Sequence, residues 1–424
     1  MLLSAVVDVR TMLLIAAGVS GCSSGNDVEA QPVDAPPPAK SAFSFETFNT
    51  TLFYAADDWI LEARRRAAAM PAAIARSEAD VLCLQAVWLP SDRRAIVDGA
   101  RSTFPYAVEL PSDDDTPVDD PRAADGSTPP PFDAPPCAGQ AAVVDTLLKC
   151  LSASCATPGA GVSSVSCIST SCAAERDALP SDARCRACVD GQLFSGEPIA
   201  RVGARCLTRT EPFPYNGGHG LVLLSRHPLE APERRVLPST EGRSAVLRAR
   251  VRLPNGASVA AYCSGLTWPR TSDRYIGRYG SPERGWLTEH LLQTQQIVEW
   301  MSATPRAVLM IETGASTEHT VDGTVLVERY ESDGINNLLA TLAEGIAPGA
   351  LSACTLCSSN PLIRPPVRRW SSRIFLRGLA GSAVTASYRT MLGAVVPVPQ
   401  AIRGTSSVPL SGFYGYRAVV SVPP

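Results

Sequence analysis

Cysteines in this chain are crowded at spacings that could bind a metal or form covalent cross-links. The 424-residue sequence holds 13 cysteines and only 4 histidines. The motifs CLSASC at 150–155 and CISTSC at 167–172 repeat the same spacing, and a Cys-x-x-Cys pair follows at 185–188. The crowded stretch comprises Cys137, Cys150, Cys155, Cys167, Cys172, Cys185, Cys188 and Cys206.

The N-terminus has the pattern of an export signal. Arg10 precedes the short apolar run 11–19, and small residues lead to Cys22. A basic residue, a short apolar run and small residues before the cleavage point define a secretory signal. The run is too short to span a membrane as a helix.

The sequence Val19-Ser20-Gly21-Cys22 resembles the bacterial lipobox. The resemblance implies a lipoprotein signal peptide over 1–21, lipidation of Cys22 and a flexible tether over 22–42. The membrane is then a partner through the lipid, and two or more acyl chains anchor a protein stably. Ser23 after the lipidated cysteine implies a lipid-anchored protein of the cell envelope, sorted to the outer membrane.

Export decides between two interpretations of the cysteines. Cys-x-x-Cys is a zinc-binding spacing, whereas dense, even-numbered cysteines in an exported chain indicate disulfides. The absence of histidine near the crowded stretch favours disulfides, so we predict a disulfide-bonded helical insertion over 137–206. Cys354 and Cys357 form a separate candidate pair. Cys83 and Cys263 lie in apolar, strand-like segments and are predicted to be buried thiols.

Composition limits the class of protein. Hydrophobic residues make up 45% and charged residues 19%, and 36 prolines and 31 glycines indicate a globular, loop-rich chain. The net charge of −3 gives no positive field for a nucleic acid, which is therefore an unlikely partner. The segment 111–136 is acidic and proline-rich, and we expect a loop there that leads into the insertion.

Hydrophobic patterning predicts strands interspersed with helices. Apolar or β-branched runs predict strands, and apolar residues at helical spacing predict helices. A hairpin is expected over 244–266, turning at Pro254-Asn255-Gly256. Further strands are expected at 43–54, 80–88, 218–228, 306–312, 371–378 and 414–422, and helices at 59–79, with a break or kink at Pro71, and at 285–301. This order indicates an α+β sandwich.

Four short motifs occur in a characteristic order. The chain contains LQAVW at 84–88, GLVLLSRHP at 220–228, CSGLTW at 263–268 and SGFYG at 411–415. They resemble LQEVW, GLxLLSRHP, THLTW and SDHYG of the endonuclease/exonuclease/phosphatase superfamily, especially its secreted, sphingomyelinase-like bacterial branch. The resemblance covers most of 43–424 outside the insertion. It implies an α/β fold: a four-layer α/β sandwich with two packed mixed β-sheets flanked by helices, and a site at one end of the sheets.

The chemistry of that superfamily is metal-assisted attack on a phosphodiester. A carboxylate holds Mg²⁺, which polarises the phosphoryl group. An Asp–His pair activates water, and a second His and an Asn stabilise developing charge.

The residues at these positions are mostly replaced here. Asn49 keeps the asparagine of the first strand, and Glu312 stands where an aspartate is expected, without the asparagine that follows it. The metal-binding glutamate corresponds to Ala86 and the histidine of THL to Gly265.

The remaining positions are also neutral. Ser372 replaces an aspartate, and Gly412 and Phe413 replace the final Asp–His pair. Glu312 alone is a weak site for an ion that requires several oxygens. We therefore expect a catalytically inactive relative without a cofactor.

The histidines offer no evident replacement base. His219 precedes a buried strand and His227 precedes a proline, so both are interpreted as structural, while His290 and His319 lie on an expected helix and loop.

Arginines near the site suggest a different use for it. A cleft that loses carboxylates and keeps arginines can hold a phosphate-bearing ligand without turnover. Arg226, Arg373 and Arg417 are the candidate anion-binding residues, with Arg270 and Arg377 also expected at the rim.

Three hypotheses remain open at this point. The first is a lipid-anchored protein that binds a ligand or partner. The second is a Mg²⁺-dependent phosphodiesterase, sphingomyelinase- or nuclease-like, with a rebuilt site around Glu312 and Asn49. In the third, the insertion 137–206 is a rigid platform for a protein partner.

Overall fold

A computed structural model shows the fold of the chain. It describes residues 42–52, 63–110, 115–123, 125–156, 165–179, 183–270, 274–316, 319–321, 324–326, 332–344, 354–363, 367–379, 385–389, 395–402 and 404–424. All described residues belong to one compact unit, Lys40–Pro424. The predicted signal peptide, Cys22 and almost all of the tether lie outside the described residues.

Two six-stranded sheets form the core of the fold. The first sheet has the order β15-β18-β1-β2-β4-β3 and the second the order β11-β14-β8-β7-β6-β5. The strands of the first sheet are β1 (Ala42–Asn49), β2 (Val81–Gln85), β3 (Tyr106–Glu109), β4 (Val222–Ser225), β15 (Thr385–Arg389) and β18 (Gly415–Ser421). Those of the second are β5 (Leu229–Val236), β6 (Ala245–Arg252), β7 (Ser258–Gly265), β8 (Ala307–Glu312), β11 (Ala343–Glu344) and β14 (Ser372–Arg377).

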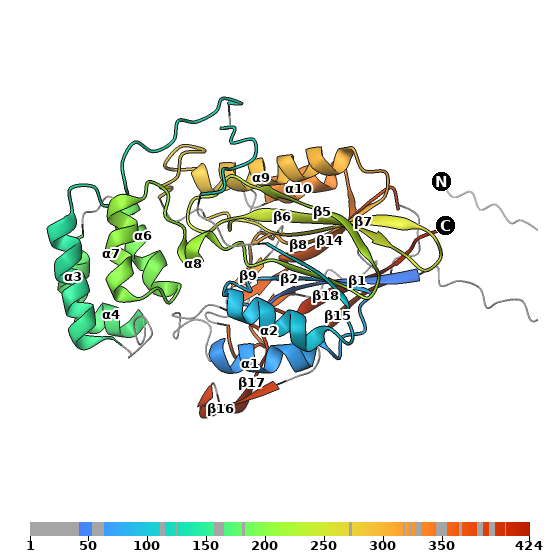
Figure 1. Ribbon diagram of the computed structural model, residues 1–424, viewed down its shortest axis with the longest axis horizontal. Helices are drawn as coiled ribbons and strands as arrows, with labels where there is room; N and C mark the ends of the chain where they lie inside the picture. The colour runs from blue at the N-terminus through green and yellow to red at the C-terminus, as the bar shows by residue number, and fades with distance from the viewer. Residues whose placement is uncertain are drawn as a thin grey trace, which may run out of the picture. The chain divides into compact units, whose positions relative to one another are not determined.

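Helices cover the outer face of each sheet (Figure 1). The helices α1 (Ala63–Ile74) and α2 (Pro90–Ala100) pack on the first sheet, and α9 (Gly285–Ser302) and α10 (Ser332–Leu339) on the second. The inner faces of the two sheets share one apolar core that includes Phe45, Val259 and Ile374. Helix, sheet, sheet and helix are the four layers that the sequence predicts, so the expected fold is confirmed.

The expected strands are present at the predicted places. The hairpin of β6 and β7 turns over 253–257, where Gly256 has a φ of 83°. Within the described residues, the helix expected at 59–79 runs from Ala63 and ends at Ile74, earlier than predicted, and it continues through Pro71.

The described parts of the segment 137–206 fold as a set of helices joined by disulfides, as predicted. The bonds are Cys137–Cys185, Cys150–Cys172, Cys155–Cys167 and Cys188–Cys206. The two repeated motifs therefore pair with each other, the first cysteine of one with the second of the other. The helices are α3 (Ala141–Ser154), α4 (Val165–Ser171), α5 (Ala173–Asp177), α6 (Ala183–Phe194) and α7 (Ile199–Thr208).

The prediction that Cys83 and Cys263 are free buried thiols is wrong. They form a disulfide that joins β2 of the first sheet to β7 of the second, and both are fully buried. Each residue lies on the inner face of its strand, so the facing sheets bring the two sulfurs together. Cys354 and Cys357 form the predicted separate disulfide.

Other segments attach to this framework. Within the acidic segment, Asp119 exchanges backbone and side-chain hydrogen bonds with Val236 at the end of β5. Within the described residues, no helix has the length and apolar character needed to cross a membrane. The remaining elements are α8 (Pro214–Gly217), β9 (His319–Val321), β10 (Thr324–Leu326), β12 (Leu356–Cys357), β13 (Val367–Arg369), β16 (Val395–Ile402) and β17 (Thr405–Pro409).

The disulfide between the sheets should stabilise the fold strongly. Cys83 and Cys263 are 180 residues apart, and Cys354 and Cys357 are 3 apart. Cross-linking a longer loop removes more chain entropy from the unfolded state. We expect replacing Cys83 and Cys263 together by alanine to lower the free energy of unfolding by about 2–4 kcal/mol.

Guanidinium denaturation without reductant measures this loss. The matched control replaces Cys354 and Cys357 by alanine and should cost less. An equal or smaller loss from the Cys83 and Cys263 pair would contradict the prediction.

Candidate functional site

The strand directions bring many loop residues to one edge of the sandwich. β1 runs parallel to β2, and β7 runs parallel to β8, so the carboxyl ends of these four strands meet there. The neighbours β18, β4, β6 and β14 are antiparallel to them, so their first residues lie at the same edge. This edge is where open α/β sheets usually bind ligands.

A cavity of about 1210 Å³ lies at this edge. Five of the superfamily positions line it: Asn49, Ala86, Gly265, Glu312 and Phe413. Ser372 and Gly412 lie directly behind them, hydrogen-bonded to Glu312 and Thr51. The structure therefore brings these predicted site positions together, although most of the side chains are neutral.

Glu312 is the acidic residue at these positions, and the protein itself occupies both of its oxygens. Ser372 Oγ donates to Oε2 at 2.5 Å, and the Gly314 amide donates to Oε1 at 3.0 Å. The carboxyl group is only 2% exposed, and its burial raises its pKa above the usual value.

The residues present do not fit the Mg²⁺ ion that the fold family implies. Mg²⁺ requires near-octahedral oxygen coordination at short distances. Glu312 is already bonded twice, and Asn49 Oδ1 accepts a hydrogen bond from the Thr51 amide at 3.0 Å. Ala86, Gly265 and Phe413 supply no side-chain oxygen.

A neutral hydrogen-bond network replaces the charged centre beside Asn49. Thr51 Oγ1 lies 2.9 Å from Ser411 Oγ and accepts from the Gly412 amide at 3.1 Å. The fully buried Arg66 of α1 donates to the carbonyls of Thr50, Thr51 and Leu410 at 2.8–3.0 Å. This arginine holds two loops of the site in fixed positions.

Backbone strain is concentrated at the same edge. Ala86 has a φ of 58° and Thr51 a φ of 48°, and in the short α8 Tyr215 and Asn216 have φ values of 54° and 53°. Such conformations are costly for residues other than glycine and cluster at functional sites. Here these residues set the direction of the loops that line the cavity.

Aromatic rings form much of the cavity wall. Trp88 and Tyr215 stack with ring centroids 5.1 Å apart, and Trp268 meets Phe413 edge-on at 6.2 Å. A side chain at Gly220 would come within 3.0 Å of the Trp88 ring, so this glycine permits the close packing.

The disulfide-bonded insertion supplies the wall opposite the sandwich. Arg176 of α5 and Arg186, Asp190 and Phe194 of α6 line the cavity. Figure 1 shows these green helices beyond the edge where the strands end. The insertion thus adds a second wall to the open end of the sandwich.

The three predicted anion-binding arginines do not line this cavity. Arg226 donates to the carbonyls of Ser77 and Ala79, at the opposite end of β4. Arg373 pairs with Glu344 at 2.7 Å, and Arg417 pairs with the buried Glu46 at 2.6 Å. The structure does not bring them to the cavity, because their strands turn these side chains toward other partners.

Of the two arginines expected at the rim, one lies away from the cavity and the other lines it. Arg377 donates to backbone carbonyls of Ser302 and Thr304. Arg270 does line the cavity and pairs there with Glu241.

Several charged residues that sequence reasoning missed do line the cavity. Arg176 pairs with Asp190 at 2.6 Å, and Arg186, Arg243 and Arg274 bring further positive charge. His219, interpreted from the sequence as structural, also lines it. A histidine between Gly218 and Gly220, just before a buried strand, is the signal that could have indicated this.

The other described histidines have structural partners. His227 Nε2 lies 3.2 Å from Asp80, and His290 Nε2 lies 3.0 Å from the Thr313 carbonyl oxygen. Burial lowers the pKa of His290 to about 4. His319 has no described side chain.

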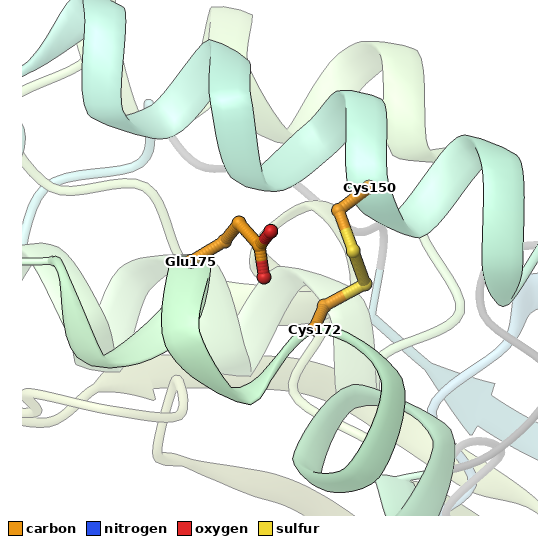
Figure 2. A group of neighbouring side chains, drawn as sticks. All are labelled: Cys150, Cys172 and Glu175. Atoms are coloured by element: carbon orange, nitrogen blue, oxygen red, sulfur yellow. A yellow bond between two sulfur atoms is a disulfide. The ribbon is translucent and has the colours of Figure 1, made fainter.

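One group of side chains among the described residues resembles a metal site in composition, but two of its members are joined by a disulfide. Figure 2 shows Cys150, Cys172 and Glu175 side by side in the insertion. The two sulfurs are bonded to each other, so neither is a free thiolate that could ligate zinc. The preference for disulfides over zinc is confirmed here.

A buried carboxyl group supports the cavity wall from behind. Glu289 of α9 is fully buried and accepts hydrogen bonds from Thr240, Thr267 and Tyr275 at 2.5–2.8 Å. Thr267 lines the cavity, so Glu289 positions part of its wall. Burial raises the pKa of Glu289 from 4.5 to about 7, although the three hydrogen bonds act against that rise.

Comparisons with known proteins give matches among solved structures. No family model matches the chain, and no curated protein matches it. The structure of SmcL has 10% identity, covers 89% of this chain and 99% of its own, and gives a TM-score of 0.49. Sphingomyelinase C from Streptomyces griseocarneus has 15% identity, with 90% and 100% covered and a TM-score of 0.47.

A third similar structure is the endonuclease/exonuclease/phosphatase from Bacteroides vulgatus. It has 10% identity, covers 90% of this chain and 100% of its own, and gives a TM-score of 0.46. At these values the fold assignment rests on the strand order and layers described above.

The buried Glu289 should make stability depend on pH. Its pKa is about 7 in the folded chain and 4.5 when unperturbed, so the folded state binds the proton more tightly. This contribution is complete below pH 4.5 and is lost as the pH rises toward 7. We expect Glu289→Gln to remove about 3 kcal/mol of pH-dependent stability between these values.

Thermal melting of both proteins across this pH range measures the difference between them. The control is Glu299→Gln, an exposed position of the same helix. Parallel curves for wild type and Glu289→Gln would disprove the assignment.

Proposed function

We propose that this chain is an exported, lipid-anchored binding protein of the endonuclease/exonuclease/phosphatase superfamily that has lost the hydrolytic chemistry. One observation carries the proposal. The superfamily positions gather on one cavity, yet the carboxylate that remains, Glu312, is buried and bonded through both oxygens to the protein. A cavity lined in this way can hold a ligand but cannot coordinate Mg²⁺ in the usual way.

The groups at the described superfamily positions and His219 offer no suitable base, which supports the same conclusion. The general base corresponds to Phe413, whose ring packs against Trp268. His219 lines the cavity, but burial and neighbouring arginines lower its pKa to about 3. Such a weak base activates water poorly at neutral pH, and loss of a general base costs about 10²–10⁴-fold in rate.

The N-terminal sequence and the disulfides support the proposed envelope location. All twelve cysteines other than Cys22 are disulfide-bonded. Such density is typical of an oxidising compartment. The lipobox-like sequence then supports anchoring of the chain by a lipid on Cys22, in the outer membrane.

A hydrolysis assay tests the proposed loss of catalysis. We expect cleavage of sphingomyelin, DNA and a generic phosphodiester to equal the blank in Mg²⁺ or Mn²⁺, because the metal ligands and the base are replaced. Glu312→Gln should behave like the wild type. A sphingomyelinase C serves as the positive control.

The opposite result would support the alternative. Metal-dependent hydrolysis that Glu312→Gln abolishes would indicate a phosphodiesterase with a rebuilt site, and Mg²⁺ would then be its cofactor.

Cys22 should determine membrane attachment. We expect Cys22→Ala to move the protein from the membrane fraction to the soluble fraction and to abolish labelling with a fatty-acid probe. Ser23→Ala keeps the cysteine and is the matched control. A Cys22→Ala protein that remains labelled would disprove lipidation at this residue.

A further inference from the structure

We propose that His219 and Arg243 bind the acidic group of an organic anion whose apolar body fills the aromatic part of the cavity. This proposal deepens the binding function proposed above and rests on it. The two residues are called the anion corner. They come from the segments that enter β4 and β6, whereas the superfamily positions lie at the carboxyl ends of β1, β2, β7 and β8 or at the starts of β14 and β18.

His219 is a buried polar side chain that faces the cavity without a partner. It is 4% exposed and lines the cavity, and neither Nδ1 nor Nε2 makes a hydrogen bond of ordinary geometry. A main-chain contact with Arg243 acts on its protonation but does not satisfy the ring. Buried polar groups in native structures are nearly always paired, so this ring is suited to a ligand.

The surroundings of the ring are positively charged. Arg243 is 4% exposed, lines the cavity, and lies over the Phe213 ring at 4.9 Å. Arg234 and Arg93 also act electrostatically on His219, and Glu109 pairs with Arg93 at 3.5 Å. A neutral imidazole that donates one N–H, beside a guanidinium, complements an anion.

The rest of the cavity has room for a large apolar body. Its volume of about 1210 Å³ greatly exceeds what a small inorganic anion fills. Trp88 and Tyr215 form one stacked wall, and Leu266, Phe194 and Ile276 add apolar surface. A site with apolar walls and a few fixed polar groups is typical for small organic ligands.

Anilinonaphthalene sulfonate and N-phenylnaphthylamine form a matched pair of probes. Both share an apolar, fluorescent body, and only the first carries an anion. We expect the oxidised chain to bind the sulfonate at least about tenfold more tightly, because a charge-assisted hydrogen bond is worth that much. Equal affinity for the two probes would overturn the proposal.

Two substitutions locate the effect. His219→Leu and Arg243→Gln should each weaken binding of the sulfonate about tenfold and leave the neutral probe unchanged. Arg250→Gln, at an exposed position of β6, is the control and should change neither. Cooperative melting of each variant verifies folding, and unchanged sulfonate binding in both cavity variants would overturn the proposal.

Competition experiments identify the chemical class of the ligand's apolar part. Displacement of the sulfonate by dodecyl phosphate indicates an acyl amphiphile, and displacement by phenyl phosphate indicates an aromatic anion; either supports the proposal. Inorganic phosphate that competes as well as both would overturn it. Diester hydrolysis would refute the proposed function and leave these results standing, whereas equal probe affinities without hydrolysis would refute the anion corner alone.

Discussion

The bond between Cys83 and Cys263 fixes the part of the molecule on which the cavity depends. It joins the two sheets inside their shared core, three residues before Ala86 and two before Gly265. A covalent bond between the two sheets therefore holds the strand ends that line the cavity. The strained backbone at Ala86 and the close packing of Trp88 on Gly220 lie just beyond this link, at the ends of β2 and β4.

At the superfamily positions of the cavity, hydrogen bonds within the protein replace the charged side chains expected there. Hydrogen bonds from Ser372 and Gly314 occupy both carboxylate oxygens of Glu312. The guanidinium of Arg66 donates to backbone carbonyls. Removing repelling carboxylates from a site generally favours stability. The positive charge of the cavity lies on other residues, which the insertion, the segment before β6 and the segment after β7 provide.

The sequence predicted the layers and the gathering of Asn49, Ala86, Gly265 and Glu312, because strand patterning and motif order determine which strand ends meet. It failed where the outcome depends on side-chain direction. Arg226, Arg373 and Arg417 lie on strands near the site, but each bonds elsewhere. The contribution of α6 to the wall was also not predictable, since no local pattern shows how an insertion packs on its host.

The connectivity of the disulfides constrains how such a chain matures. Cys83–Cys263, Cys137–Cys185 and Cys150–Cys172 each enclose other cysteines in the sequence. Oxidation in the order of emergence during export would pair Cys83 with Cys137 first, which is not a native pair. Thiol–disulfide exchange must correct such pairs. The yield of native protein in a host should therefore be limited by disulfide isomerisation capacity and not by oxidising strength.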